Sequence, residues 1–124
     1  MGRHDVTYVL VVDDDPTLLS VVSDTLDLEG YAVETATNGA EALTAAEREQ
    51  PALVLLDMKM PVLDGWGFVR EAGARGLQLL VVVMTAAQDA RRRATEIGAV
   101  DCLAKPFELD ELLATVGRHF PPSC

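Results

Sequence analysis

The stretch Leu53-Val54-Leu55-Leu56-Asp57-Met58-Lys59-Met60-Pro61 is a short apolar run that ends on a carboxylate, and Asp64-Gly65 follows closely. A short apolar run bounded by turn signals is typical of a buried strand in a parallel sheet. In open α/β sheets, ligands bind just beyond the carboxyl ends of the strands. Because Asp57 stands at such an end, its carboxylate is the first candidate for the chemistry of this protein.

Outward from this stretch, apolar runs of strand type alternate with segments of helical periodicity along the chain. The expected strands are 6–12, 31–36, 53–56, 78–84 and 100–104, and the expected helices are 16–30, 38–50, 66–74, 90–97 and 109–120. Strict alternation with short connections predicts a parallel sheet covered by helices on both faces. We therefore expect a flavodoxin-like (βα)5 three-layer sandwich with strand order 2-1-3-4-5. One domain over residues 1–124 is expected, with its core at about 6–120.

Composition excludes several classes of function. The net charge of −10 leaves no basic stripe for nucleic acid, and the one basic run, Arg91-Arg92-Arg93, is expected to be a solvated helix face. No apolar run is long enough for a membrane span and the N-terminus has no secretory pattern, so a cytoplasmic protein without membrane contact is expected. His4, His119, Cys102 and Cys124 lack ligand spacing, which argues against zinc and disulfides.

Polar residues stand where the predicted strands end. Asp13 and Asp14 follow the first strand, Asp57 the third, Thr85 the fourth and Lys105 the fifth. Taken singly, the acids and the threonine could be turn residues or helix caps, and the lysine could be a solvated loop charge. Because the carboxyl ends of parallel strands share one edge of the sheet, the placement of all five residues there indicates a site.

The chemistry of this set is that of phosphoryl transfer. Clustered carboxylates repel one another unless a cation is present, and all-oxygen ligands suit Mg²⁺. Such a metal would offset the charge of an incoming phosphoryl group and make Asp57 a usable nucleophile. A lysine and a hydroxyl facing the same point, Lys105 and Thr85, would hold the remaining phosphoryl oxygens.

Four motifs of the chain resemble those of receiver domains in two-component response regulators, including the chemotaxis receivers. They are Val11-Val12-Asp13-Asp14-Asp15-Pro16, Leu56-Asp57-Met58-Lys59-Met60-Pro61 with Asp64-Gly65, Met84-Thr85-Ala86 and Leu103-Ala104-Lys105-Pro106-Phe107. The resemblance implies that Asp57 accepts a phosphoryl group from a sensor histidine kinase or a phosphotransfer protein. It further implies an output protein or domain beyond this chain, and a homodimer is compatible with it.

The resemblance also implies roles for the other site residues. Asp14, Asp57 and the backbone carbonyl of Lys59 would bind Mg²⁺ directly, and Asp13 would act mainly through water. Thr85 and Lys105 would contact the phosphoryl group, and the Lys105–Pro106 peptide bond would be cis.

The chain departs from the family pattern at one switch residue. Three residues before the lysine the family usually carries Tyr or Phe, which turns inward as the threonine moves on phosphorylation, whereas this chain has Cys102. Phosphoacceptance does not depend on this ring. We expect Thr85 to make its move and Cys102 to transmit little of it.

Two alternatives remain at this stage. Asp13 and Asp15 fit the D-x-D-x-T motif of haloacid-dehalogenase-like phosphatases, with Asp13 as nucleophile and Asp15 as acid/base. That assignment leaves Asp57 unexplained and needs a later acidic pair, which Glu108, Asp110 and Glu111 supply only within a helical pattern. The other alternative is a pseudo-receiver that binds partners without phosphorylation.

Overall fold

A computed structural model describes residues 7–121 of the chain. Strands and helices alternate without exception, in the order β1 (Tyr8–Val12), α1 (Pro16–Leu28), β2 (Ala32–Ala36), α2 (Gly39–Arg48), β3 (Leu53–Asp57), α3 (Gly65–Ala74), β4 (Val81–Ala86), α4 (Ala87–Ile97), β5 (Asp101–Lys105) and α5 (Leu109–His119). The strands form one parallel sheet in the order β2-β1-β3-β4-β5, which confirms the flavodoxin-like prediction. None of the helices in the described range is long and apolar enough to cross a membrane.

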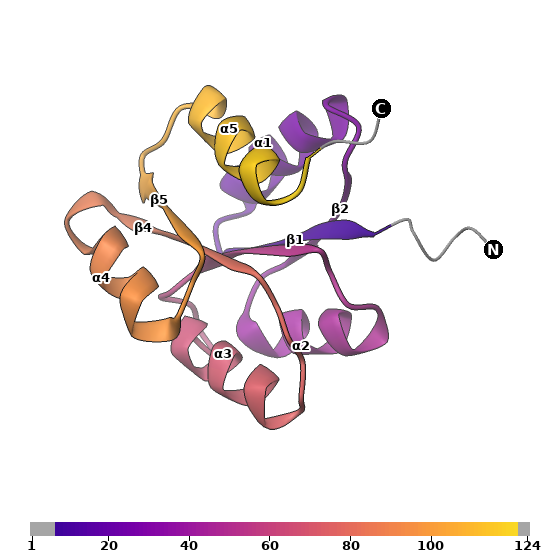
Figure 1. Ribbon diagram of the computed structural model, residues 1–124, viewed down its shortest axis with the longest axis vertical. Helices are drawn as coiled ribbons and strands as arrows, with labels where there is room; N and C mark the ends of the chain where they lie inside the picture. Colours follow the sequence, from indigo (N-terminus) through magenta and orange to yellow (C-terminus); the bar gives the residue numbers. More distant parts are fainter. Residues whose placement is uncertain (1–6, 122–124) are drawn as a thin grey trace.

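The sheet is the middle of three layers. Helices α1 and α5 lie on one face, and α2, α3 and α4 lie on the other (Figure 1). The central strands β1 and β3 are buried along their whole length, as expected for strands covered by helices on both sides. Strand β2, at one edge of the sheet, is only partly buried.

The order of the strands places the site. Strand β1 pairs with β2 on one side and with β3 on the other, so the direction of winding reverses between β1 and β3. A crevice opens beyond the carboxyl ends at such a switch point. Asp13 follows β1 and Asp57 ends β3, and the register Val12↔Leu56 brings the two strand ends level.

Helix boundaries follow local signals. Asp15 caps α1 by accepting from the backbone N–H of Thr17 and Leu18, with Pro16 in the first turn. Asn38 caps α2 by accepting from the N–H of Glu41. Gly98 ends α4 in the left-handed conformation, with a φ of 70°.

Several predicted boundaries differ from the observed ones. The fourth strand begins at Val81 and not at residue 78, because its ladder with β3 starts only at the pair Val54↔Val81. Helix α4 begins at Ala87 and not at Ala90, since its first turn carries no inward apolar residue that the periodicity could reveal. The predicted start of the first strand at residue 6 lies outside the described residues.

Candidate functional site

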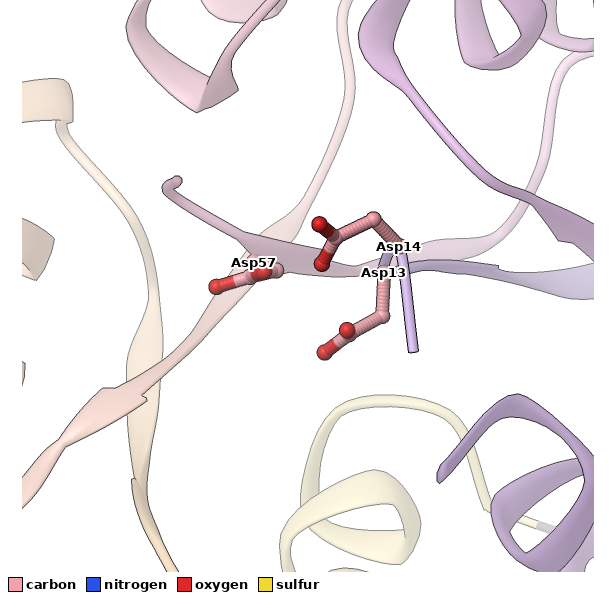
Figure 2. A group of neighbouring side chains, drawn as sticks. All are labelled: Asp13, Asp14 and Asp57. Atoms are coloured by element: carbon pink, nitrogen blue, oxygen red, sulfur yellow. The ribbon is translucent and has the colours of Figure 1, made fainter. Parts of the chain in front are cut away.

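Three carboxylates converge at the switch point. Ligand atoms of Asp13, Asp14 and Asp57 all lie within 4.8 Å of one another (Figure 2). Asp13 and Asp57 are buried, and Asp14 is exposed at the mouth of the group. The predicted convergence of these acids is confirmed, and their oxygen-only donor set fits a hard divalent cation such as Mg²⁺.

Lys105 reaches this acidic group from the end of β5. Its Nζ lies 2.7 Å from Asp13 Oδ2 and 3.6 Å from Asp57 Oδ1. The peptide bond between Lys105 and Pro106 is cis, the geometry that the resemblance implies. One ammonium group therefore contacts two of the three carboxylates, which leaves the site with an excess of negative charge.

The pKa shifts reflect this crowding. Burial raises the pKa of Asp57, the charge of Asp13 raises it further, and Lys105 offsets only part of the rise. Burial alone would lower the pKa of Lys105, but its hydrogen bond to Asp13 and the charge of Asp57 outweigh burial, so the pKa of Lys105 is raised. The ionised form of Asp57 is therefore disfavoured, and additional positive charge in the site would stabilise it.

Thr85 lies at the same edge of the sheet. It is buried within β4, one residue beyond Met84, which is the register partner of Asp57. The N-cap of α4 is Ala86, which makes no side-chain capping bond. The ordinary explanation of Thr85 as a helix cap is therefore wrong.

Three of the acids that the phosphatase alternative invokes, Asp15, Glu108 and Glu111, have structural roles. Asp15 caps α1 and lies outside the acidic group. Glu108 and Glu111 form a capping box at the start of α5. These contacts explain the acids without catalysis and leave Asp57 as the central carboxylate.

The sequence analysis quoted the loop between β3 and α3 as part of the acceptor motif, but it assigned a role there only to the carbonyl of Lys59. The N–H of Lys59 lies 3.5 Å from Asp57 Oδ1, so this loop borders the acceptor carboxylate. Asp64 caps α3 by accepting from the N–H of Gly67, and the N–H of Gly65 donates to the Met58 carbonyl at 3.0 Å. The Asp64-Gly65 pair after the strand was the feature of the sequence that could have predicted these two contacts.

The predicted solvated face of three arginines is wrong for one of them. Arg91 and Arg92 are exposed, but Arg93 lies under the ring of Trp66, with its guanidinium carbon 4.8 Å from the ring centroid. Glu96 Oε1 accepts from Trp66 Nε1 at 3.2 Å and lies 3.3 Å from Arg93 Nη1. This contact joins α3 to α4. Sequence periodicity could not reveal it, because the two helices are far apart in the chain.

Cys102, at the predicted switch position, is a half-buried free cysteine on β5. It packs against the part of the core that includes Ala94 of α4. Cys102 is therefore a small side chain packed between β5 and this part of the core.

A family model described as the response regulator receiver domain matches residues 9–117. The chain belongs to the response regulator receiver family. It is therefore a phosphoacceptor signalling domain, with its acidic site at Asp13, Asp14 and Asp57 and with Lys105 beside it.

Two kinds of curated relative agree with this assignment, one about as long as this chain and one about twice as long. The sporulation initiation phosphotransferase F of Bacillus subtilis is 35% identical over 115 residues, which cover 91% of this chain and 93% of that protein. The transcriptional regulatory protein PrrA of Mycobacterium tuberculosis is 44% identical over 110 residues, which cover 87% of this chain. The receiver domain spans only 47% of PrrA, about half the length of such relatives.

Solved receiver structures match over nearly the whole chain. The chemotaxis protein CheY4 of Vibrio cholerae gives a TM-score of 0.82 at 32% identity, with coverage of 93% of this chain and 99% of that one. The receiver domain of the sensor histidine kinase PA1611 of Pseudomonas aeruginosa gives 0.80 at 32% identity, covering 91% and 96%. That structure has a magnesium ion coordinated in its active site cleft.

Proposed function

We propose that Asp57 is the phosphoacceptor and that the donor is the phosphohistidine of a sensor histidine kinase or phosphotransfer protein. A carboxylate oxygen of Asp57 attacks phosphorus, and the phosphorus–nitrogen bond of the donor breaks. The electron pair of that bond stays on the imidazole nitrogen, and an acyl phosphate forms. The observation that carries the proposal is the convergence of three carboxylates within 4.8 Å, with Lys105 in contact with two of them.

Asp13, Asp14, Asp57 and the backbone carbonyl of Lys59 would hold Mg²⁺, with Asp13 acting mainly through water. When bound, the ion supplies the positive charge that offsets repulsion between Asp57 and the incoming phosphoryl oxygens. The fit rests on the donor set, which offers only oxygens and carries more negative charge than Lys105 neutralises.

Lys105 and Thr85 would contact the oxygens of the phosphoryl group. The role of Lys105 is supported by its Nζ, which already faces Asp57. The role of Thr85 is supported by its position in β4, one residue before that strand ends at the same edge of the sheet. Groups that stabilise the charge of the transferring phosphoryl speed both its arrival and its hydrolysis. The domain would thus promote its own phosphorylation and dephosphorylation, with Thr85 also serving as the switch residue.

Residues 1–124 would form one receiver domain that acts on an output protein or domain. The length of relatives such as PrrA is consistent with an attached output domain, whereas that of sporulation phosphotransferase F is consistent with a separate partner. A homodimer is compatible with either arrangement.

The test is labelling with acetyl phosphate in the presence of Mg²⁺, followed by mapping of the modified residue. The wild type should be labelled at Asp57, and Asp57→Asn should not be labelled, because an amide is not a nucleophile toward phosphorus. Asp24→Asn, an exposed charge on α1, is the matched control and should label normally. Label on Asp13 would favour the phosphatase, and a wild type that takes up no label would favour the pseudo-receiver.

A further inference from the structure

We infer that Gly39, the first residue of α2, is a positioning residue for the loop of residues 58–64, here called the acceptor loop. This inference rests on the proposed function, because the acceptor loop carries the Lys59 carbonyl. The N–H of Gly39 donates to the Leu63 carbonyl oxygen at 2.8 Å. The first N–H groups of a helix have no partner inside the helix, so this N–H of α2 is free to bind the acceptor loop.

The contact between Gly39 and Leu63 leaves no room for a side chain. A Cβ at position 39 would lie 2.6 Å from the Leu63 carbonyl oxygen and 3.0 Å from Leu63 Cβ. The oxygen belongs to the backbone and cannot turn aside as a side chain can. Any residue other than glycine must therefore push the acceptor loop away from α2.

A second glycine receives the side chain of Leu63. A Cβ at Gly67, in the first turn of α3, would lie 2.4 Å from Leu63 Cδ1. Leu63 is thus held through its backbone by α2 and through its side chain by α3, and it packs on the core between them. The closest contact at Gly67 is with a side-chain methyl, with Leu63 Cγ next at 3.1 Å, whereas the closest contact at Gly39 is with the backbone.

The strained backbone of Val62 indicates that contacts with neighbouring elements hold the acceptor loop in place. Val62 has a φ of 70°, which β-branched residues rarely adopt. The Leu63 N–H donates to the Pro61 carbonyl at 2.8 Å and closes a tight turn around Val62. Val62 itself is 82% exposed, so its own packing does not enforce this conformation. A strained residue persists where its surroundings over-determine it, and here the fixed neighbour is Leu63.

The other end of the acceptor loop is fixed by α3. The N–H of Gly65 donates to the Met58 carbonyl at 3.0 Å, and a Cβ at Gly65 would lie 2.8 Å from Met58 Cα. Lys59 therefore stands between two anchored points, Met58 and Leu63. The carbonyl of Lys59 thus belongs to a short segment that is fixed at both ends, and Gly39 provides the anchor that comes from outside the β3–α3 connection.

The experiment measures the Mg²⁺ dissociation constant through the fluorescence of Trp66, the single tryptophan, which follows the acceptor loop at the start of α3. Gly39→Ala should weaken Mg²⁺ binding by about tenfold, a change typical of losing a group that orients a metal ligand. The matched control is Gly73→Ala in α3, where a Cβ would meet nothing within 4 Å and Mg²⁺ binding should be unchanged.

A rescue separates positioning from mere stability. Gly67→Ala should weaken Mg²⁺ binding less than Gly39→Ala does, because the side chain of Leu63 can turn aside, and Leu63→Val should restore binding, because it removes the methyl that the new Cβ would meet at 2.4 Å. The same Leu63→Val change should not rescue Gly39→Ala, whose clash is with the backbone. If Gly39→Ala fails to fold, amide hydrogen exchange at Gly39 in the wild type decides the matter: Mg²⁺ should slow it, because the Gly39 N–H is held by the Leu63 carbonyl, and an exchange rate that Mg²⁺ leaves unchanged overturns the inference.

The outcomes distinguish this inference from the proposed function. A lower melting temperature for Gly39→Ala with an unchanged Mg²⁺ dissociation constant would make Gly39 structural only and overturn the inference. The proposed site would survive that result, provided that Asp14→Ala loses Mg²⁺ binding. A wild type that does not bind Mg²⁺ would overturn both.

Discussion

Replacing Asp57 by Asn should stabilise the metal-free domain, because it removes a buried charge from a repulsive group. At an effective dielectric constant of about 20, two charges 4.8 Å apart, the outer limit of the acidic group, repel by about 3.5 kcal/mol. The attraction between Asp57 and Lys105 at 3.6 Å is about 4.6 kcal/mol on the same scale. Removing two repulsions and one attraction leaves a net stabilisation of about 2 kcal/mol.

Two further effects act on this value in opposite directions. Asp14 is exposed, so water screens part of its repulsion and lowers the gain. Asp57 is buried, so loss of its desolvation penalty raises the gain. For a domain of 124 residues, about 2 kcal/mol corresponds to a rise of about 5–10 °C in the melting temperature.

The assay is urea unfolding with EDTA present, at neutral pH and in acid. Asp24→Asn serves as control, since it changes the net charge equally from an exposed position on α1. Because folding raises the pKa of Asp57, the wild type loses stability relative to the Asn variant as pH rises from the ordinary carboxyl pKa of about 4 through the raised pKa of the folded domain. The advantage of Asp57→Asn should be full at neutral pH and absent at about pH 3. An Asp57→Asn protein no more stable than Asp24→Asn at neutral pH would refute the electrostatic reasoning.

The remaining predictions concern the metal and helix α4. Millimolar Mg²⁺ should raise the melting temperature of the wild type, because the ion relieves repulsion in the acidic group, and Asp14→Ala should lose most of that rise in calorimetry; equal rises would remove Asp14 from the site. Arg93→Ala should lower the stability of the domain by about 1 kcal/mol, since it removes a partly buried cation–π contact, and should shift the emission of Trp66. An Arg92→Ala protein that changes both readouts as much would contradict this. Addition of beryllofluoride, a phosphoryl mimic, should change amide NMR shifts at the junction of β4 and α4 that follows Thr85, and in α4, more than around Cys102 and α5; changes at Cys102 equal to those in Cys102→Tyr would show that the ring is dispensable.

Much of the site was accessible to sequence reasoning because each of its members follows an apolar strand. Asp13, Asp57 and Lys105 were placed by the rule that functional residues stand at the carboxyl ends of parallel strands, and the structure brings them together. The strand order followed from alternation and right-handed crossovers, and it is confirmed. The cap at Asp15 is likewise a local feature, since capping depends on neighbours within one turn.

Only the tertiary structure decided the contacts between elements that are distant in the chain. The pairing of Lys105 with Asp13, the burial of Arg93 under Trp66 and the seat of Leu63 against Gly39 each join different elements, and no local period encodes them. The sequence alone determined which segments become strands and helices and at which ends the reactive groups lie, because hydrophobic periodicity and capping act over a few residues. The distances at which those groups meet, and the strain that one of the loops bears, arise from how the layers pack.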